Sequence, residues 1–388
     1  MAETGDPNTV FLIAGEPSGD ALGGPLIGRL REIDPSLKFA GVGGPNMAAH
    51  GLETLFPMEE LSVMGLAEVL PRLPNLVRRI AETARAIEAS RPAVVVTIDS
   101  PDFTLRVAKR VRHPGIPIVH YVAPSVWAWR PGRARKLSRL VDHVMTLLPF
   151  EPPYFEAVGL PATFVGHPVA EQRPAMDGAA FRRTLGIAEN DTVLAVLPGS
   201  RGGEVDRLLP VFGRSVERLT AGLPDRTLRI VVPTLPHLAE RVRAATAGWH
   251  GTVDIVADRE RFFDALAASD AALCASGTVV LELARAGVPG VVAYRVNPIT
   301  AWLARHLIKL KYVSLINIVA GRGIMPEHLQ QDCEPERLAR DLARLLSEPG
   351  AGDDQRAAFA DVLRQLGEGG TPPSRRAADV VISMMRGD

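Results

Sequence analysis

The segment Leu194-Ala-Val-Leu-Pro-Gly-Ser-Arg-Gly-Gly-Glu204 joins an apolar run to a turn rich in small residues. Such a run predicts a buried strand that ends near Pro198 and leads into a helix through Gly199 and Ser200. Backbone N–H groups at the start of a helix attract anions, and the guanidinium of Arg201 is a planar, permanently charged donor that suits phosphate. The segment therefore predicts a strand–turn–helix unit of an α/β sheet with an anion site at its turn.

Short apolar runs alternate with helical patterns along the whole chain, which is typical of parallel α/β sheets. Helices are expected between the strands, for example at 75–89 and 336–346. The expected strands are 10–14, 38–42, 94–99, 118–122, 143–147 and 162–165 in the first half, and 192–197, 228–232, 253–256, 271–275 and 290–294 in the second.

The two sets of strands are separated by the segment 166–174, which carries two prolines and no hydrophobic periodicity. A chain of 388 residues exceeds a typical single core. We therefore predict an α/β fold of two Rossmann-like domains, 1–168 and 169–366, that face each other across a cleft. A hinge at 367–373 precedes a last helix, 374–388, which is expected to pack back on the first domain or on a partner subunit of a homodimer.

Composition excludes several classes of protein. Forty-four basic residues balance 44 acidic ones, so a bulk nucleic-acid binder is not expected. No apolar run reaches 18 residues, so no transmembrane helix is predicted, and the N-terminus lacks a signal-peptide pattern. Cys274 and Cys333 have no metal-ligand spacing, which favours a reducing, cytoplasmic setting without a disulfide or a metal site.

The first candidate motif is Ala14-Gly-Glu-Pro-Ser-Gly-Asp20, which follows the first expected strand. Its glycines allow a sharp turn, and Glu16 at the strand tip is a candidate carboxylate of the cleft. The alternative is a plain helix cap made by Ser18 or Asp20.

The second motif is Thr97-Ile-Asp-Ser-Pro-Asp-Phe103, in which an apolar strand presents Asp99 at its carboxyl end. A carboxylate held there can accept a proton from a substrate hydroxyl. Asp102 lies near a helix start, where a cap is the favoured role. A cap or turn residue is the alternative for Asp99 as well.

Three further stretches favour lipid or sugar ligands. Aromatic and basic residues gather in the segment 121–136, where Trp127 and Arg130 suit acidic ligands, lipid headgroups or sugar stacking. The apolar stretches 61–77 and 302–312 suit a membrane surface, and Pro71 and Pro74 are expected to break any continuous helix in the first. The alternatives are a buried Trp pair beside a basic helix start, and ordinary amphipathic helices.

A second anion loop, Ser276-Gly277-Thr278, follows the expected strand 271–275. Glu282 lies one helical turn further, where its carboxylate suits a ribose diol. Together with the loop 199–201 this pattern predicts a nucleotide diphosphate site, and the alternative is a pair of ordinary strand-to-helix turns.

Several motifs, taken in order, resemble the lipid-A-disaccharide synthase family: 16–20, 98–103, 124–130, 197–201, 314–317 and 320–322. The resemblance implies the GT-B glycosyltransferase fold and an inverting transfer that joins UDP-2,3-diacylglucosamine to 2,3-diacylglucosamine 1-phosphate in lipid A biosynthesis. It also implies a cytoplasmic enzyme, peripheral on the inner membrane, without a catalytic metal or cofactor.

The resemblance gives individual residues a role. Asp99 is expected to be the general base, and Glu16 a second carboxylate needed for activity. The expected UDP-sugar site comprises Gly199, Ser200, Arg201, Ser276, Gly277, Thr278, Glu282 and Asn317. The expected acceptor- and membrane-facing residues are Val63, Met64, Leu66, Val69, Leu70, Leu73, Trp127 and Arg130.

Two other functions fit the same pattern. A UDP-sugar 2-epimerase would use the nucleotide site of the second half and would need no lipid-facing surface. A non-catalytic lipid-binding or scaffold protein would need neither Asp99 nor the anion loops for turnover.

Overall fold

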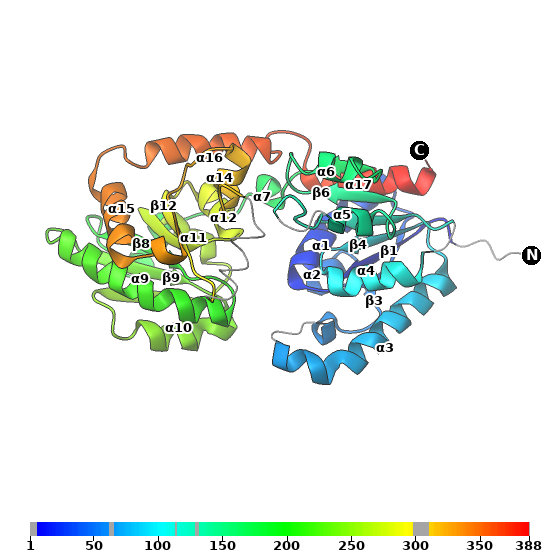
Figure 1. Cartoon of the computed structure of the whole chain (residues 1–388), viewed down its shortest axis with the longest axis horizontal. Coiled ribbons are helices and arrows are strands. Elements are labelled where there is room, and N and C mark those ends of the chain that lie inside the picture. Colours follow the sequence, from blue (N-terminus) through cyan, green and yellow to red (C-terminus); the bar gives the residue numbers. More distant parts are fainter. Residues whose placement is uncertain (1–5, 62–65, 113–114, 129–131, 298–309, 388) are drawn as a thin grey trace, which may run out of the picture. The chain divides into compact units, whose positions relative to one another are not determined.

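A computed structural model describes residues 6–61, 66–112, 115–128, 132–297 and 310–387, which form two compact units (Figure 1). Unit 1 combines residues 1–171 with 366–388, and unit 2 is 172–365. The first division falls three residues beyond the expected boundary because the short helix α7 (Pro168–Glu171) stays with unit 1.

Unit 1 contains a seven-stranded parallel sheet in the order β3-β2-β1-β4-β5-β6-β7. The strands are β1 (Thr9–Ala14), β2 (Lys38–Val42), β3 (Glu53–Thr54), β4 (Val94–Ile98), β5 (Ile118–Tyr121), β6 (His143–Thr146) and β7 (Ala162–Phe164). Its other helices are α1 (Pro17–Ile33), α2 (Pro45–Ala49), η1 (Met58–Leu61), α3 (Leu66–Ser90), α4 (Pro101–Arg110), α5 (Gly132–Leu137), α6 (Pro152–Glu156) and α17 (Pro373–Arg386).

Both faces of this sheet are covered, as a parallel sheet requires. Successive side chains of β1 point to opposite faces, so Val10 and Leu12 enter one core while Phe11 and Ile13 enter another. The first core includes buried residues of α1 and α17, and the second includes residues of α3 and α4. The C-terminal helix α17 thus packs on unit 1 of its own chain (Figure 1).

Unit 2 has a six-stranded parallel sheet in the order β10-β9-β8-β11-β12-β13. Its strands are β8 (Thr192–Leu197), β9 (Leu228–Pro233), β10 (Thr252–Val256), β11 (Ala271–Ala275), β12 (Gly290–Tyr294) and β13 (Glu327–Leu329). Its described helices are α8 (Gly178–Thr184), α9 (Gly202–Gly222), η2 (Pro236–Leu238), α10 (Ala239–Thr246), α11 (Phe262–Ala267), α12 (Val279–Ala286), α14 (Leu315–Ala320), η3 (Gln330–Asp332), α15 (Pro335–Ser347) and α16 (Asp353–Gln365).

The expectation that Pro71 and Pro74 break a helix is wrong. Helix α3 runs continuously through both positions. Each proline removes one backbone hydrogen bond near the start of a long helix, while the later turns are held by the buried residues Ile80, Ala84 and Ile87.

The alternative reading of the first motif, a cap of α1 by Ser18 or Asp20, is wrong. The N-cap position of α1 is Glu16, whose side chain makes no capping hydrogen bond to the helix. Asp20, only 1% exposed, instead accepts hydrogen bonds from the backbone N–H groups of Gly44, Asn46 and Met47 at 2.8–3.0 Å. It therefore caps α2, the next helix of the chain, across the turn that follows β2.

Two findings concern the cysteines and the question of membrane-spanning helices. Cys274 and Cys333 are both buried and free. Across the described ranges, helices that combine the length and the apolar character needed to span a bilayer are absent.

The capping role of Asp20 makes a stability prediction. Asp20→Ala leaves several buried N–H groups without their acceptor, so the free energy of unfolding should fall by roughly 3 kcal/mol. Urea denaturation measures this change. The control Asp34→Ala removes a partly exposed carboxylate that accepts hydrogen bonds from Ser36 at the end of α1; it should cost less than about 1 kcal/mol. Equal losses for the two variants would contradict the assigned role.

Candidate functional site

The chain turns sharply after β4, at the carboxyl edge of the unit 1 sheet. Asp99 and Ser100 both have positive φ, 49° and 43°, in the left-handed region that non-glycine residues rarely adopt. The Asp99 N–H donates to the carbonyl of Tyr121 at 2.9 Å, and the Thr104 hydroxyl donates to the Asp99 carbonyl at 2.7 Å. Strain held by such bonds is typical of functional sites.

The motif after β1 packs directly on this turn. A side chain at Gly15 would place its Cβ 2.6 Å from the Ser100 Oγ, so only glycine fits there. The Ser18 hydroxyl donates to the Asp99 Oδ2 at 2.9 Å. Ser18 therefore orients the predicted base, a role that sequence reasoning missed because its partner lies 81 positions away.

Glu16 comes from the strand next to that of Asp99. Strands β1 and β4 are parallel neighbours in which Ala14 pairs with Ile98, so both motifs leave the same edge of the sheet. Glu16 is exposed at the first turn of α1.

The expected cap by Asp102 is not found: α4 has Ser100 at its N-cap, without a side-chain cap bond.

Trp127 lies in the loop after β5, at the same edge. Its indole Nε1 donates to the Glu151 Oε1 at 2.9 Å, and its ring meets Phe150 edge to face with centroids 5.2 Å apart. Glu151 follows β6, is 3% exposed, and accepts the backbone N–H groups of Leu147 and Leu148 through Oε2. Three donors thus converge on one buried carboxylate, which no sequence pattern had indicated.

Burial strongly affects the titration of Glu151. The loss of solvent raises the pKa of its carboxyl from 4.5 to about 7, although the hydrogen bonds from Trp127, Leu148 and Leu147 act in the opposite direction.

The opening loop of unit 2 has the predicted strand–turn–helix form. Gly199 follows β8 with a φ of 110°, and a Cβ there would lie 2.5 Å from the Glu204 Oε2. Ser200 is exposed, and Arg201 is the N-cap of α9. The turn therefore needs glycine for both its backbone angle and its space.

Arg201 extends into solvent. Its side chain is 79% exposed and its only described ion pair is a long one, 3.5 Å from Nη1 to the Glu204 Oε1. Glu204 is largely buried and accepts the Tyr294 hydroxyl at 3.2 Å. The guanidinium is thus free to turn toward an anion at the start of α9.

The second loop lies beside the first, because β8 and β11 are parallel neighbours. The Ser276 hydroxyl donates to the Val313 carbonyl at 3.2 Å, and a Cβ at Gly277 would meet nothing within 4 Å. Thr278 is the exposed N-cap of α12. Burial raises the pKa of the Glu282 carboxyl, against the opposing effect of the Arg259 charge.

Asn317 is 1% exposed and shapes its own loop. Its amide donates to the Met325 carbonyl and to the Glu327 Oε1, while its oxygen accepts the N–H groups of Ile324 and Met325. The structure thus gives Asn317 a positioning role, and its direct contact with a UDP-sugar stays a prediction.

Part of the predicted membrane-facing set is not described. Val63, Met64 and Arg130 lie outside the described residues, as do the side chains of Leu66, Val69, Leu70 and Leu73. The same holds for 302–309 of the second apolar stretch.

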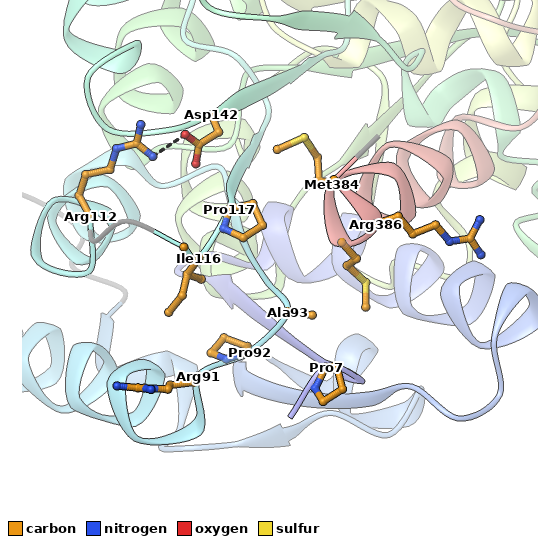
Figure 2. A pocket seen from close by; sticks show the side chains of 13 residues that line it. Pro7, Arg91, Pro92, Ala93, Arg112, Ile116, Pro117, Asp142, Met384 and Arg386 are labelled. Carbon is orange, nitrogen blue, oxygen red and sulfur yellow. Dashed lines mark hydrogen bonds and ion pairs between the residues drawn. The ribbon is translucent and has the colours of Figure 1, made fainter. Parts of the chain in front are cut away.

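A hollow of about 970 Å³ lies at the opposite edge of the unit 1 sheet (Figure 2). Its lining includes Pro7, Ala93, Pro117 and Asp142, which precede β1, β4, β5 and β6. Ligands of parallel sheets bind at the carboxyl ends of the strands, and the predicted site residues do not line this hollow. The hollow is therefore set apart from the candidate site.

The described ranges were expected to hold no metal site. Among those residues, no group of three or more His, Cys, Asp or Glu side chains could hold a metal ion.

The chain thus has two parallel sheets with tight turns at their carboxyl edges. The turn of unit 1 presents a carboxylate, and unit 2 carries the two predicted anion loops. This architecture defines a two-domain α/β protein of the GT-B class. Solved structures share this fold over 98% of the chain: the UDP-GlcNAc 2-epimerase of Neisseria meningitidis bound to UDP-GlcNAc (TM-score 0.62, 13% identity, 100% of that chain) and MurG of Acinetobacter baumannii (0.57, 15%, 99%).

The chain belongs to the lipid-A-disaccharide synthase family, an enzyme family of glycosyltransferases. The family model for lipid-A-disaccharide synthetase matches residues 10–375. The lipid-A-disaccharide synthase of Rhodospirillum centenum is 54% identical over 98% of this chain and 95% of its own length, and that of Ruegeria pomeroyi is 50% identical over 97% and 96%.

The titration of Glu151 predicts a pH-dependent stability. A carboxyl whose pKa rises on folding stabilises the fold below its unfolded pKa, and this contribution is lost as the pH rises through about 7. At about 1.4 kcal/mol per pKa unit, the loss amounts to about 3 kcal/mol.

Urea denaturation of wild type and Glu151→Gln at about pH 5 and pH 8 measures this contribution, because glutamine does not titrate. The advantage of the wild type over the variant should be larger at the lower pH. A difference that is the same at both pH values would contradict the buried, titrating carboxyl.

Proposed function

We propose that this enzyme transfers the diacylglucosaminyl group of UDP-2,3-diacylglucosamine to the 6-hydroxyl of 2,3-diacylglucosamine 1-phosphate. The products are UDP and a β-1,6-linked disaccharide 1-phosphate, a precursor of lipid A. The observation that carries the proposal is the carboxylate of Asp99, which Ser18 orients at the carboxyl edge of the unit 1 sheet. The chain that holds it belongs to the lipid-A-disaccharide synthase family.

Asp99 acts as the general base in this proposal. Its Oδ2 accepts the Ser18 hydroxyl, which leaves the carboxylate with lone pairs for a second hydroxyl, that of the acceptor sugar. As the acceptor oxygen attacks the anomeric carbon, its proton passes to Asp99 and the bond from that carbon to the diphosphate breaks. One direct displacement inverts the anomeric configuration. Glu16, from the neighbouring strand, is the proposed second carboxylate.

The turns of unit 2 hold the departing diphosphate. Backbone N–H groups at the start of α9 and α12 and the exposed guanidinium of Arg201 supply positive charge where negative charge develops. We expect Glu282, half-buried one helical turn beyond the second loop, to accept the ribose hydroxyls of the nucleotide. Ser200, Ser276, Gly277 and Thr278 complete the proposed site.

The acylated substrates suggest a site at the inner-membrane surface, with Trp127, Arg130 and the first part of α3 on the lipid-facing side. Support comes from Val77, the last residue of the apolar stretch 61–77, which lies on α3 and is 49% exposed. Apolar residues exposed on an amphipathic helix bind the boundary of a bilayer.

A disaccharide-forming assay with both acylated substrates tests the reaction. Asp99→Asn keeps the shape of the side chain but removes the base, so turnover should fall by about 10²–10⁴-fold with UDP binding retained. Ser18→Ala keeps the base and removes its partner, and should lose less, about 10-fold.

The reaction assignment would be overturned in two ways. Full turnover of Asp99→Asn would remove the base from the mechanism. Formation of a 2-epimer from UDP-N-acetylglucosamine, without an acceptor, would indicate an epimerase instead.

Arg201→Ala tests the diphosphate site. Loss of a charge-assisted hydrogen bond, about 1.5–3 kcal/mol, should weaken UDP binding roughly 10- to 100-fold in calorimetry. Arg214→Ala, at an exposed position further along α9, is the matched control and should leave the affinity unchanged. An unchanged affinity in Arg201→Ala would exclude this residue from the phosphate site.

Flotation with anionic liposomes tests the membrane surface. The wild type should float with the vesicles at low salt, and the double variant Leu70→Ser, Leu73→Ser should float less because it loses apolar contact with the bilayer. Met176→Ser, which removes a 41% exposed side chain from unit 2, is the control. If the wild type stays in the protein fraction, the membrane proposal is wrong.

A further inference from the structure

The buried carboxylate of Glu151 joins two loops at the edge of the sheet where Asp99 lies. Through Oε2 it holds the backbone just after β6, at Leu147 and Leu148, and through Oε1 it holds the indole of Trp127 in the loop after β5. Burying a carboxylate together with three hydrogen-bond donors costs desolvation free energy. If position 151 served only to pack the core, an apolar residue there would make the fold more stable.

The loop that Glu151 holds is bound to the turn of the proposed base. Tyr121, the last residue of β5, accepts the Asp99 N–H at 2.9 Å. The next residue, Val122, has a φ of 79°, which is rare for a β-branched side chain, and its N–H donates to the Met145 carbonyl of β6. Strained backbone thus follows both of the neighbouring strands β4 and β5. Such strain persists only where the surrounding hydrogen bonds and packing hold the residues in place.

The orientation of the indole is fixed in two ways. The hydrogen bond to Glu151 sets the position of Nε1, and the edge-to-face contact with Phe150, at an interplanar angle of 87°, sets the plane of the ring. Trp127 is only half-buried, so part of its ring remains open to solvent at this edge. A fixed, partly open aromatic ring suits a sugar or another apolar face of a ligand.

We propose that Glu151 is a positioning residue for acceptor binding: its carboxylate fixes the indole of Trp127 and, through it, the loop after β5 beside Asp99. The inference rests on the proposed function, in which unit 1 binds the acylated glucosamine 1-phosphate. Glu151 does not touch the substrate and acts through Trp127.

The test separates acceptor from donor kinetics. In Glu151→Gln the amide oxygen can still accept the two backbone N–H groups, but its NH₂ group then faces the indole N–H, so the Trp127 bond is lost. The KM for the acceptor should rise about 10-fold or more, while the KM for the UDP-sugar stays within about twofold. Glu156→Gln, an exposed residue of α6, is the matched control and should leave both unchanged.

A double-mutant cycle with Trp127→Phe shows whether the two residues act as a unit. Phenylalanine keeps the ring but removes the donor, so this variant should also raise the acceptor KM. In that background, Glu151→Gln should add little. The Trp127→Phe result also stands alone if Glu151→Gln fails to fold.

Four results would overturn the inference. Three of them are an unchanged acceptor KM in Glu151→Gln, an unchanged acceptor KM in Trp127→Phe, and full additivity of the two substitutions. An equal rise of both KM values would indicate a general structural role instead, and would overturn it too. Failure of the proposed function is distinguishable, because the wild type would then form no disaccharide in the same assay.

Discussion

The left-handed turn at Asp99 and Ser100 sets the shape of the carboxyl edge of unit 1. Two such residues cost of order 1–3 kcal/mol each, and the surrounding structure holds them in place. A glycine at position 15 leaves room for Ser100, and the hydroxyl of Ser18 meets the carboxylate that the turn presents. These contacts come from the segment that directly follows the neighbouring strand β1, so packing at the edge of the sheet positions the proposed base.

Unit 2 also has a turn with positive φ at the end of a strand, and this turn presents a cation, the guanidinium of Arg201. Gly199, with its positive φ, gives the turn after β8 the space that Glu204 requires, and α9 begins three residues later, with Arg201 at its N-cap. The proton removal proposed for unit 1 and the charge stabilisation proposed for unit 2 would each use residues at the carboxyl ends of parallel strands, where such folds bind ligands. The proposed transfer needs both functions and assigns one to each unit.

Local patterns predicted the fold well because most strands are continuous apolar runs. The strands that were missed, β3 and β13, are two and three residues long, and polar residues dominate both. The turns at Asp99 and Arg201 could be predicted because their sequence signals are local, while the roles of these residues stay predictions. Contacts between residues far apart in the sequence could not be predicted. Asp20 caps a different helix from its own, and Glu151 meets Trp127 only after β5 and β6 pair. Residues 63, 64 and 130 lie outside the described residues.

The central claim is a single displacement with Asp99 as base, which inverts the anomeric carbon. Nuclear magnetic resonance of the disaccharide formed from the two acylated substrates tests this most directly. The account predicts a β linkage to the 6-hydroxyl of the acceptor. An α-linked product would contradict it, because retention requires a second displacement or a different attacking geometry.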